Sequence, residues 1–151
     1  MTLETDPQSP IEYFPGNAVT LSRGESARTS FLVGCLVPVI LYPTTVVMGH
    51  FGPGRIIETH DQLLARCLGR KIPFQATVYH LDLSSSNFWE RRVKEYEDHF
   101  RQMKEIIVDV TSISMENILE KAYPHYSKIL IDWTAGGKPN IEIQPAGREI
   151  C

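Results

Sequence analysis

Two apolar segments separated by three residues constrain the fold most strongly. "CLVPVILY" covers residues 35–42 and "VVMGHF" covers residues 46–51, and both are rich in the side chains that strands favour. The intervening "PTT" is short enough for a tight connection. The pattern predicts strand, turn and returning strand between Thr29 and Phe51, ended by "GPGR" at 52–55.

The turn fixes which residues of this hairpin face each other. If Pro43 and Thr44 form the turn, antiparallel pairing sets Val37 opposite His50. Cys35 is then the diagonal neighbour of His50 on the same face, at roughly 7–8 Å between backbones. We therefore expect the thiol and the imidazole to be neighbours at one end of the sheet.

Two further residues bear on this hairpin. Thr29 lies six positions before Cys35 and shares its face if the intervening chain is extended. Pro38 cannot donate a hydrogen bond to a sheet ladder, so it favours an edge strand, a bulge or a short turn after Cys35.

The rest of the chain alternates helical and strand patterns. The expected elements are a helix capped by Thr59 and Gln62 and ended by Gly69, a strand at 74–81, a helix with the apolar stripe Trp89, Val93, Tyr96, Phe100 and Met103, a strand at 105–110, a helix at 114–123, and strands at 128–133 and 140–143.

These elements define the domain organisation. Residues 1–17 hold three prolines and few apolar anchors and are expected to form an extended N-terminal arm. Residues 18–151 suit a single domain with one core. The order of elements predicts an α+β fold with mixed or largely antiparallel, sandwich-like sheets and helices packed outside.

Composition excludes several classes of protein. The net charge is -3 with no basic patch, so we expect no nucleic-acid partner. The longest apolar run is far shorter than the ~20 residues of a membrane helix, and the N-terminus lacks a signal-peptide pattern. We expect a cytoplasmic protein without membrane insertion, with export by a signal-independent route left open.

The spacing of cysteines and histidines gives no ligand pattern. The chain has three cysteines and five histidines, without C-x-x-C or H-x-x-x-H spacing, so neither a disulfide framework nor a metal or other cofactor is expected. Cys67 is interpreted as core filler, Cys151 as part of an unordered end, and His80 as a core histidine.

A cysteine beside a histidine has a chemical use. A thiol becomes a strong nucleophile when histidine accepts its proton, and the imidazole can then protonate the leaving group. A Thr29 hydroxyl or a backbone carbonyl could fix the tautomer of His50, and Gly34 would leave room for backbone amides at an oxyanion. On the residues alone, a structural role for Cys35 and His50 is the commoner explanation.

The hairpin sequence itself resembles a known family. "TSFLVGCLVPVILYP" followed by "VMGHFGPG" is similar to the centre of the CheD family of chemoreceptor glutamine deamidases. That family has a threonine, five residues and a cysteine after a small pair, then a strand ending in tyrosine and a returning strand ending in methionine, a spacer and His-Phe. Thr29, Cys35, His50 and Phe51 fall on these positions. The chain departs from the pattern at Val33–Gly34 and at "HLDLSSS".

The resemblance implies a cysteine-dependent hydrolase that converts glutamine to glutamate on a partner protein, releasing ammonia through a thioester. It implies Cys35 as nucleophile, His50 as general base and acid, Thr29 as its orienter, and Gly34 and Phe51 at the oxyanion and substrate rim. The layout is also similar to that of the cytotoxic necrotizing factor toxins. Two alternatives remain: a cysteine amidase or acyl-transfer enzyme for a small molecule, and a catalytically silent binding domain on the same fold.

Overall fold

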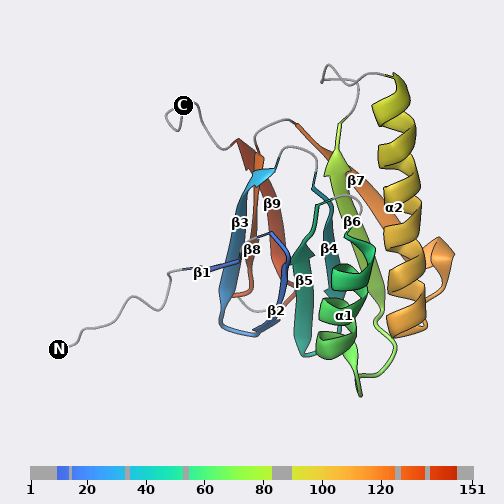
Figure 1. Ribbon diagram of the computed structural model, residues 1–151. Coiled ribbons are helices and arrows are strands. Elements are labelled where there is room, and N and C mark those ends of the chain that lie inside the picture. The colour runs from blue at the N-terminus through green and yellow to red at the C-terminus, as the bar shows by residue number, and fades with distance from the viewer. Residues whose placement is uncertain are drawn as a thin grey trace.

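The computed structural model describes residues 10–13, 15–32, 35–52, 55–82, 90–124, 127–134 and 137–145. It forms three layers, a four-stranded sheet, a five-stranded sheet and a pair of helices (Figure 1). The elements in chain order are β1 (Ile11–Glu12), β2 (Asn17–Ser22), β3 (Ser26–Leu32), β4 (Val37–Leu41), β5 (Thr45–His50), α1 (Ile56–Cys67), β6 (Gln75–Leu81), α2 (Glu90–Thr111), a 3-10 turn (Met115–Asn117), β7 (Ile118–Tyr123), β8 (Ser127–Asp132) and β9 (Asn140–Pro145).

Both sheets are mixed. The five-stranded sheet has the order β2-β5-β4-β6-β7, with antiparallel neighbours except for the parallel pair β6 and β7. The four-stranded sheet has the order β1-β3-β8-β9, and only β1 and β3 run parallel. The predicted α+β sandwich with outer helices is thereby confirmed.

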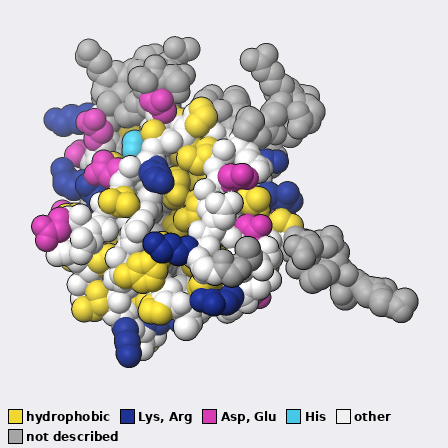
Figure 2. Space-filling view, turned by 180° about the vertical axis from the view of Figure 1, so that it is seen from behind, with side chains coloured by type: hydrophobic (Ala, Val, Ile, Leu, Met, Phe, Trp, Pro, Cys, Tyr) yellow, Lys and Arg dark blue, Asp and Glu magenta, His cyan; other side chains and the backbone are white. Residues whose placement is uncertain are grey.

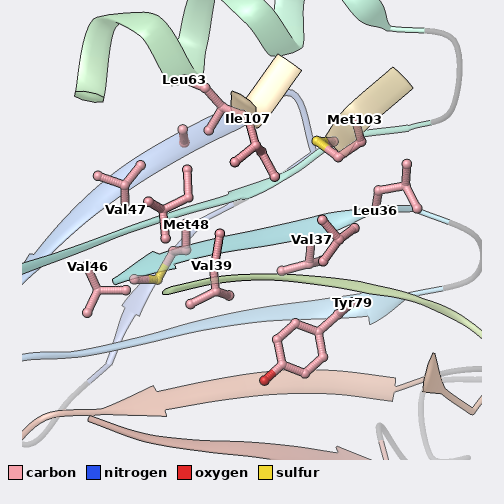
Figure 3. Close-up of a cluster of buried hydrophobic side chains, with 14 of the residues drawn as sticks. Leu36, Val37, Val39, Val46, Val47, Met48, Leu63, Tyr79, Met103 and Ile107 are labelled. Atoms are coloured by element: carbon pink, nitrogen blue, oxygen red, sulfur yellow. The ribbon is translucent and has the colours of Figure 1, made fainter. Parts of the chain in front are cut away.

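The five-stranded sheet lies in the middle and buries both faces. Figure 3 shows Leu63 of α1 and Ile107 of α2 on its helical side, whereas Tyr79 of β6 points toward the four-stranded sheet. All three side chains are buried. A strand buried on both faces reads as a continuous apolar run, which explains "VPVIL" in β4.

The predicted hairpin register is confirmed. Val39 pairs with Met48, and Leu36 and Phe51 exchange backbone hydrogen bonds of 2.8 and 3.0 Å, so the same register extends along both strands. At the turn, the Tyr42 amide donates to the carbonyl of Thr45 over 2.9 Å.

Pro38 lies in the central strand of the sheet, and the expected edge position is wrong. It pairs with Val78 of β6, on the side where its missing N–H is not needed. Toward β5 the ladder is interrupted between the Val39–Met48 pair and the Leu36–Phe51 pair, where Pro38 would have to donate to Gly49. The cost of this proline is thus limited to one ladder hydrogen bond.

Two elements predicted beyond residue 100 are wrong. Residues 105–110 continue α2 and do not form a strand, because Met103 and Ile107 extend the buried stripe that begins at Tyr96. The helix expected at 114–123 is replaced by the 3-10 turn and by β7, which lies at the sheet edge beside β6. Trp89 lies outside the described residues.

The first helix begins four residues earlier than predicted. Arg55 is the N-cap residue of α1, and the hydroxyl of Thr59 donates to the Arg55 carbonyl from within the helix. Gln62 accepts a hydrogen bond of 3.2 Å from the backbone of Ala18, so the expected capping box does not form. The C-terminal end agrees with the prediction, since Gly69 adopts a φ of 80° just beyond α1.

The expected arm at residues 1–17 is wrong in its second part. β1 pairs with β3, and Tyr13 is buried against the core. The Gly16 amide donates to the carbonyl of His50 over 2.7 Å, and β2 already begins at Asn17. Tyr13 is the apolar anchor that holds this segment. Residues 1–9 lie outside the described part of the chain.

The surface mixes charges of both signs. Figure 2 shows the face opposite to that of Figure 1, where hydrophobic side chains form a strip between scattered basic and acidic side chains. No helix within the described ranges is long and apolar enough to cross a membrane.

Candidate functional site

The two sheets meet at a hydrogen bond between His50 and Thr29. His50 ends β5 in the five-stranded sheet, and Thr29 lies on β3 in the facing sheet. The distance from Nδ1 of His50 to Oγ1 of Thr29 is 2.5 Å. The Thr29 hydroxyl also donates to the backbone carbonyl of Tyr13 over 2.9 Å. Because the single hydroxyl proton is used on Tyr13, Thr29 accepts from His50, and Nδ1 of the imidazole carries its proton.

The other ring nitrogen of His50 is therefore the basic one. Its Nε2 atom is buried and has no hydrogen-bond partner among the described residues. Burial lowers the pKa of His50 to about 4, so the imidazole is neutral at pH 7. A neutral imidazole with a free lone pair on Nε2 can accept a proton.

Thr29 reaches His50 by a route different from the predicted one. The pairing of β3 with β8 changes register between Thr29 and Leu32. Side chains therefore do not alternate regularly between the two sheet faces from Thr29 onward, and spacing alone does not place Thr29 on the face of Cys35. Thr29 instead crosses the sandwich from the facing sheet. The predicted partnership of Thr29 with His50 is present, but sheet packing produces it.

Cys35 directly precedes Leu36, which bridges to Phe51, and lies two residues before β4 begins at Val37. The alternation of side chains in β4, extended back to Cys35, predicts a side chain on the face of Val37, diagonal to that of His50. Its side chain is half-buried, and burial raises the pKa of its thiol. The thiol is not hydrogen-bonded to Nε2 of His50. Contacts of this kind are often long in a free enzyme and tighten only with substrate.

Tyr123 fixes the backbone of the candidate nucleophile. Its hydroxyl donates to the carbonyl of Cys35 over 2.6 Å, across a sequence separation of 88 residues. The Tyr96 hydroxyl accepts from the amide of Leu81 over 2.7 Å and is also hydrogen-bonded with Tyr123. These hydrogen bonds could not be predicted from the sequence. The pattern around Tyr123 predicts a helix, and no local spacing connects Tyr123 to Cys35.

Phe51 does not join the site. Its side chain is 1% exposed and lies on the helical face of the sheet, opposite to His50. The ring covers Gly49 so closely that a Cβ atom on Gly49 would lie 2.3 Å from Cε2 of Phe51. Phe51 thus packs the hairpin against the helices. Gly34, the other predicted rim residue, lies outside the described residues.

The remaining cysteines and histidines lie elsewhere. Cys67 is buried in α1, as expected for core filler, and Cys151 lies outside the described residues. His80 is half-buried, with its ring 4.7 Å from that of Phe100. His60 bonds to Asp109 across 2.8 Å on the surface. Among the described residues no three histidines, cysteines or carboxylates cluster in a way that could hold a metal ion.

The arrangement has a definite chemical capacity. Cys35 is half-buried just before β4, and His50 at the end of the neighbouring β5 is a buried, neutral imidazole whose tautomer is fixed by Thr29. Such a pair can support attack by sulfur on a carbonyl carbon. No protein-family model matches the chain, and no curated protein matches it either.

Proposed function

We propose that this protein is a cysteine-dependent hydrolase that deamidates glutamine side chains of a partner protein. The observation that carries the proposal is the hydrogen bond from Nδ1 of His50 to Thr29, which leaves Nε2 as the basic nitrogen of the imidazole. The resemblance of the hairpin sequence to the CheD deamidases supports the same roles for these three residues.

The reaction follows from these roles. The sulfur of Cys35 attacks the amide carbon of glutamine while Nε2 of His50 takes the thiol proton. The imidazolium returns that proton to the departing nitrogen, which leaves as ammonia, and a thioester remains on Cys35. Water, deprotonated by His50, then cleaves the thioester and gives glutamate and the free thiol.

The charge states favour general-base catalysis over a resting ion pair. Burial raises the pKa of Cys35 and lowers the pKa of His50, so both groups are neutral before substrate binds. The proton therefore moves as the sulfur attacks. The hydrogen bond to Thr29 helps the imidazole to hold its added charge in that step.

The exposure of the two candidate catalytic residues favours a substrate that approaches from solvent and contacts Cys35 before His50. Cys35 is half-buried, whereas His50 is fully buried. A flexible glutamine side chain on the surface of another protein can approach a partly open thiol. The shielded imidazole then remains out of contact with bulk water.

Mass spectrometry tests the reaction. A bacterial or eukaryotic cell lysate is incubated with the wild-type protein or with Cys35→Ala, and glutamines that gain about one mass unit are identified. Cys67→Ala is the matched control, because Cys67 is buried in α1 and has no proposed role in the reaction. We expect deamidated glutamines with the wild type and with Cys67→Ala, and none with Cys35→Ala.

Alkylation separates the alternatives when no deamidated protein is found. A working nucleophile reacts with iodoacetamide faster at Cys35 than at Cys67, and His50→Ala slows that reaction. Turnover of a small amide or ester that depends on Cys35 would favour the small-molecule amidase. Equal labelling at both cysteines, with no turnover, would indicate the silent binding domain.

A further inference from the structure

Three large apolar side chains are exposed together after α1. Leu68 is 75% exposed, Ile72 is 62% exposed and Phe74 is 53% exposed, all within one short connection to β6. Figure 1 shows this connection beside the β4–β5 turn, at the end of the five-stranded sheet away from the start of β4, where Cys35 lies. Apolar side chains exposed as a group, and not singly, indicate an interaction surface.

A basic depression adjoins these side chains. Its volume is about 360 Å³, and its lining residues are Tyr42, Pro43, Thr44, Thr45, Gly69, Arg70 and Lys71. The guanidinium of Arg70 is held in place by hydrogen bonds to the Arg66 carbonyl, at 2.8 Å, and to the Thr45 hydroxyl, at 3.0 Å. It also lies 5.6 Å from the centre of the Tyr42 ring. A fixed guanidinium in a hollow suits recognition of a phosphate group.

The segments that form this surface carry cations and no carboxylate, and the nearby Glu25 accepts a hydrogen bond from the amide of Ser22, which pairs with Thr45. The sequence contains no aspartate or glutamate between residues 62 and 81, or between 27 and 57, which include the hairpin. Within the described ranges, Arg66, Arg70 and Lys71 form no ion pair, whereas Arg55, Arg101 and Lys104 each contact a carboxylate. A local excess of cations on a chain of net charge -3 favours an anionic partner.

We propose that residues 66–74 and the adjoining depression form a peripheral docking site for an anionic membrane surface. Phosphate groups of the lipids bind beside Arg70 and Lys71, while Leu68, Ile72 and Phe74 enter the boundary between headgroups and acyl chains. A free phosphate would use the cations but leave the three apolar side chains in water. Docking of this kind keeps the chain on one side of the bilayer and requires no spanning helix.

The proposal does not depend on the chemistry of Cys35. It does orient the molecule, because a membrane at the β4–β5 turn leaves the Cys35 end of the sheet facing the aqueous phase.

Vesicle sedimentation tests the docking. The full chain is mixed with vesicles of phosphatidylcholine alone, or of phosphatidylcholine with phosphatidylglycerol, at low and at high salt. We expect binding to the anionic vesicles that weakens as salt rises, because screening acts on exposed charges. Parallel tubes without vesicles detect self-association, and inorganic phosphate is titrated separately in a thermal-shift assay.

Two variants and a matched control locate the surface. Arg70→Gln with Lys71→Gln removes the charges, and Leu68→Ser with Ile72→Ser removes apolar contacts. Each double variant should reduce the vesicle partition coefficient by more than about tenfold. Ile57→Ser makes the same kind of change at a side chain 78% exposed on the first turn of α1, and should bind like the wild type.

Several results would overturn the proposal. The first is that the protein binds neutral and anionic vesicles equally well, or sediments without any vesicles. The second is that it binds inorganic phosphate but no vesicles. The third is that the double variants bind anionic vesicles as well as Ile57→Ser does. Circular dichroism checks that each variant is folded. If loss of the Arg70 hydrogen bonds disturbs α1, the single variant Lys71→Gln replaces the double charge variant. It should still weaken binding to anionic vesicles.

Discussion

Thr29 is the residue on which the state of His50 depends. Its hydroxyl oxygen accepts a hydrogen bond from Nδ1 of the imidazole, and its O–H donates one to the Tyr13 carbonyl, so it connects two groups in the buried interior. Without the hydroxyl, both partners would be buried and unpaired. A buried polar group that loses its partner costs about 1–3 kcal/mol.

We therefore predict that Thr29→Val lowers the free energy of unfolding by about 1–3 kcal/mol, although valine has nearly the same shape as threonine. Thr29→Ser retains the hydroxyl and should lose less. Urea denaturation measures both values, and ¹⁵N chemical shifts of the imidazole report the tautomer. A Thr29→Val protein as stable as the wild type, with its proton still on Nδ1, would contradict the proposed hydrogen-bond order.

The low pKa of His50 has a consequence for stability. In the unfolded chain the imidazole titrates near its ordinary pKa of 6.5, whereas in the folded protein the pKa is about 4. Between these values the unfolded state binds the additional proton, so stability falls as pH falls. The loss begins below about pH 6.5, is complete near pH 4, and reaches up to about 3 kcal/mol.

Urea denaturation at a series of pH values checks this prediction. His50→Asn removes the titrating group but keeps an N–H donor near the position of Nδ1, so the loss between pH 6.5 and 4 should shrink. His60→Asn is the comparison, because His60 is a partly exposed surface residue paired with Asp109. An unchanged pH profile in the His50 variant would assign the loss to other groups.

At the scale of elements, the hairpin depends on the contact between Gly49 and Phe51. A Cβ atom at Gly49 would lie 2.3 Å from the buried Phe51 ring, so any side chain there must displace that ring. We predict that Gly49→Ala lowers the free energy of unfolding by about 1–3 kcal/mol, as overpacking does elsewhere.

Gly52→Ala is the matched control, because the nearest atom to an added Cβ there is 3.9 Å away. It should change stability by less than the Gly49 variant. In a Phe51→Leu background, Gly49→Ala should cost less than in the wild type, since the smaller side chain leaves space. Additive losses in this double-mutant cycle would show that the two residues do not interact.

Elements with a clear period and a defined turn could be predicted from the sequence. The β4–β5 hairpin was predicted in its correct register, because Pro43 and Thr44 left only one tight connection. Residues 105–110 could not be assigned reliably, since a short run such as "IIV" fits a buried helix and a strand equally well. β7 gives no alternation at all, because only Ile118 and Tyr123 are buried within it.

The candidate site was predictable only in part, for a related reason. His50 ends β5, and Cys35 comes just before the neighbouring β4, so the period of two in this hairpin predicts how they relate. The Thr29 contact crosses between sheets, and the Tyr123 contact spans 88 residues, so neither follows from spacing within an element. Thr29 was a candidate from the sequence through its spacing to Cys35 and the family resemblance, whereas only the fold identified Tyr123.

At the scale of the whole molecule, the site is also a junction between distant parts of the chain. The His50–Thr29 bond connects the two sheets, Tyr123 connects the β7 edge to Cys35, and Tyr13 brings the N-terminal segment beneath Thr29. Damage to the N-terminal segment should therefore affect both the stability of the protein and the state of His50.

Truncation tests this coupling. Removal of residues 1–9 leaves β1, Tyr13 and the Gly16 hydrogen bond in place and should change little. Removal of residues 1–14 deletes β1 and a buried aromatic side chain, and it leaves the Thr29 hydroxyl without its acceptor. We predict a loss of about 3–5 kcal/mol for the longer deletion, as for other buried aromatic residues, together with an altered ¹⁵N spectrum of His50.

Tyr13→Phe separates the backbone of this residue from its side chain. The hydroxyl of Tyr13 is buried without a hydrogen-bond partner in the described part of the chain, so its removal should leave stability unchanged or slightly raised. The carbonyl that accepts from Thr29 is retained, so the His50 spectrum should match that of the wild type. If Tyr13→Phe altered that spectrum as strongly as the longer deletion, the phenol and not the carbonyl would set the state of His50.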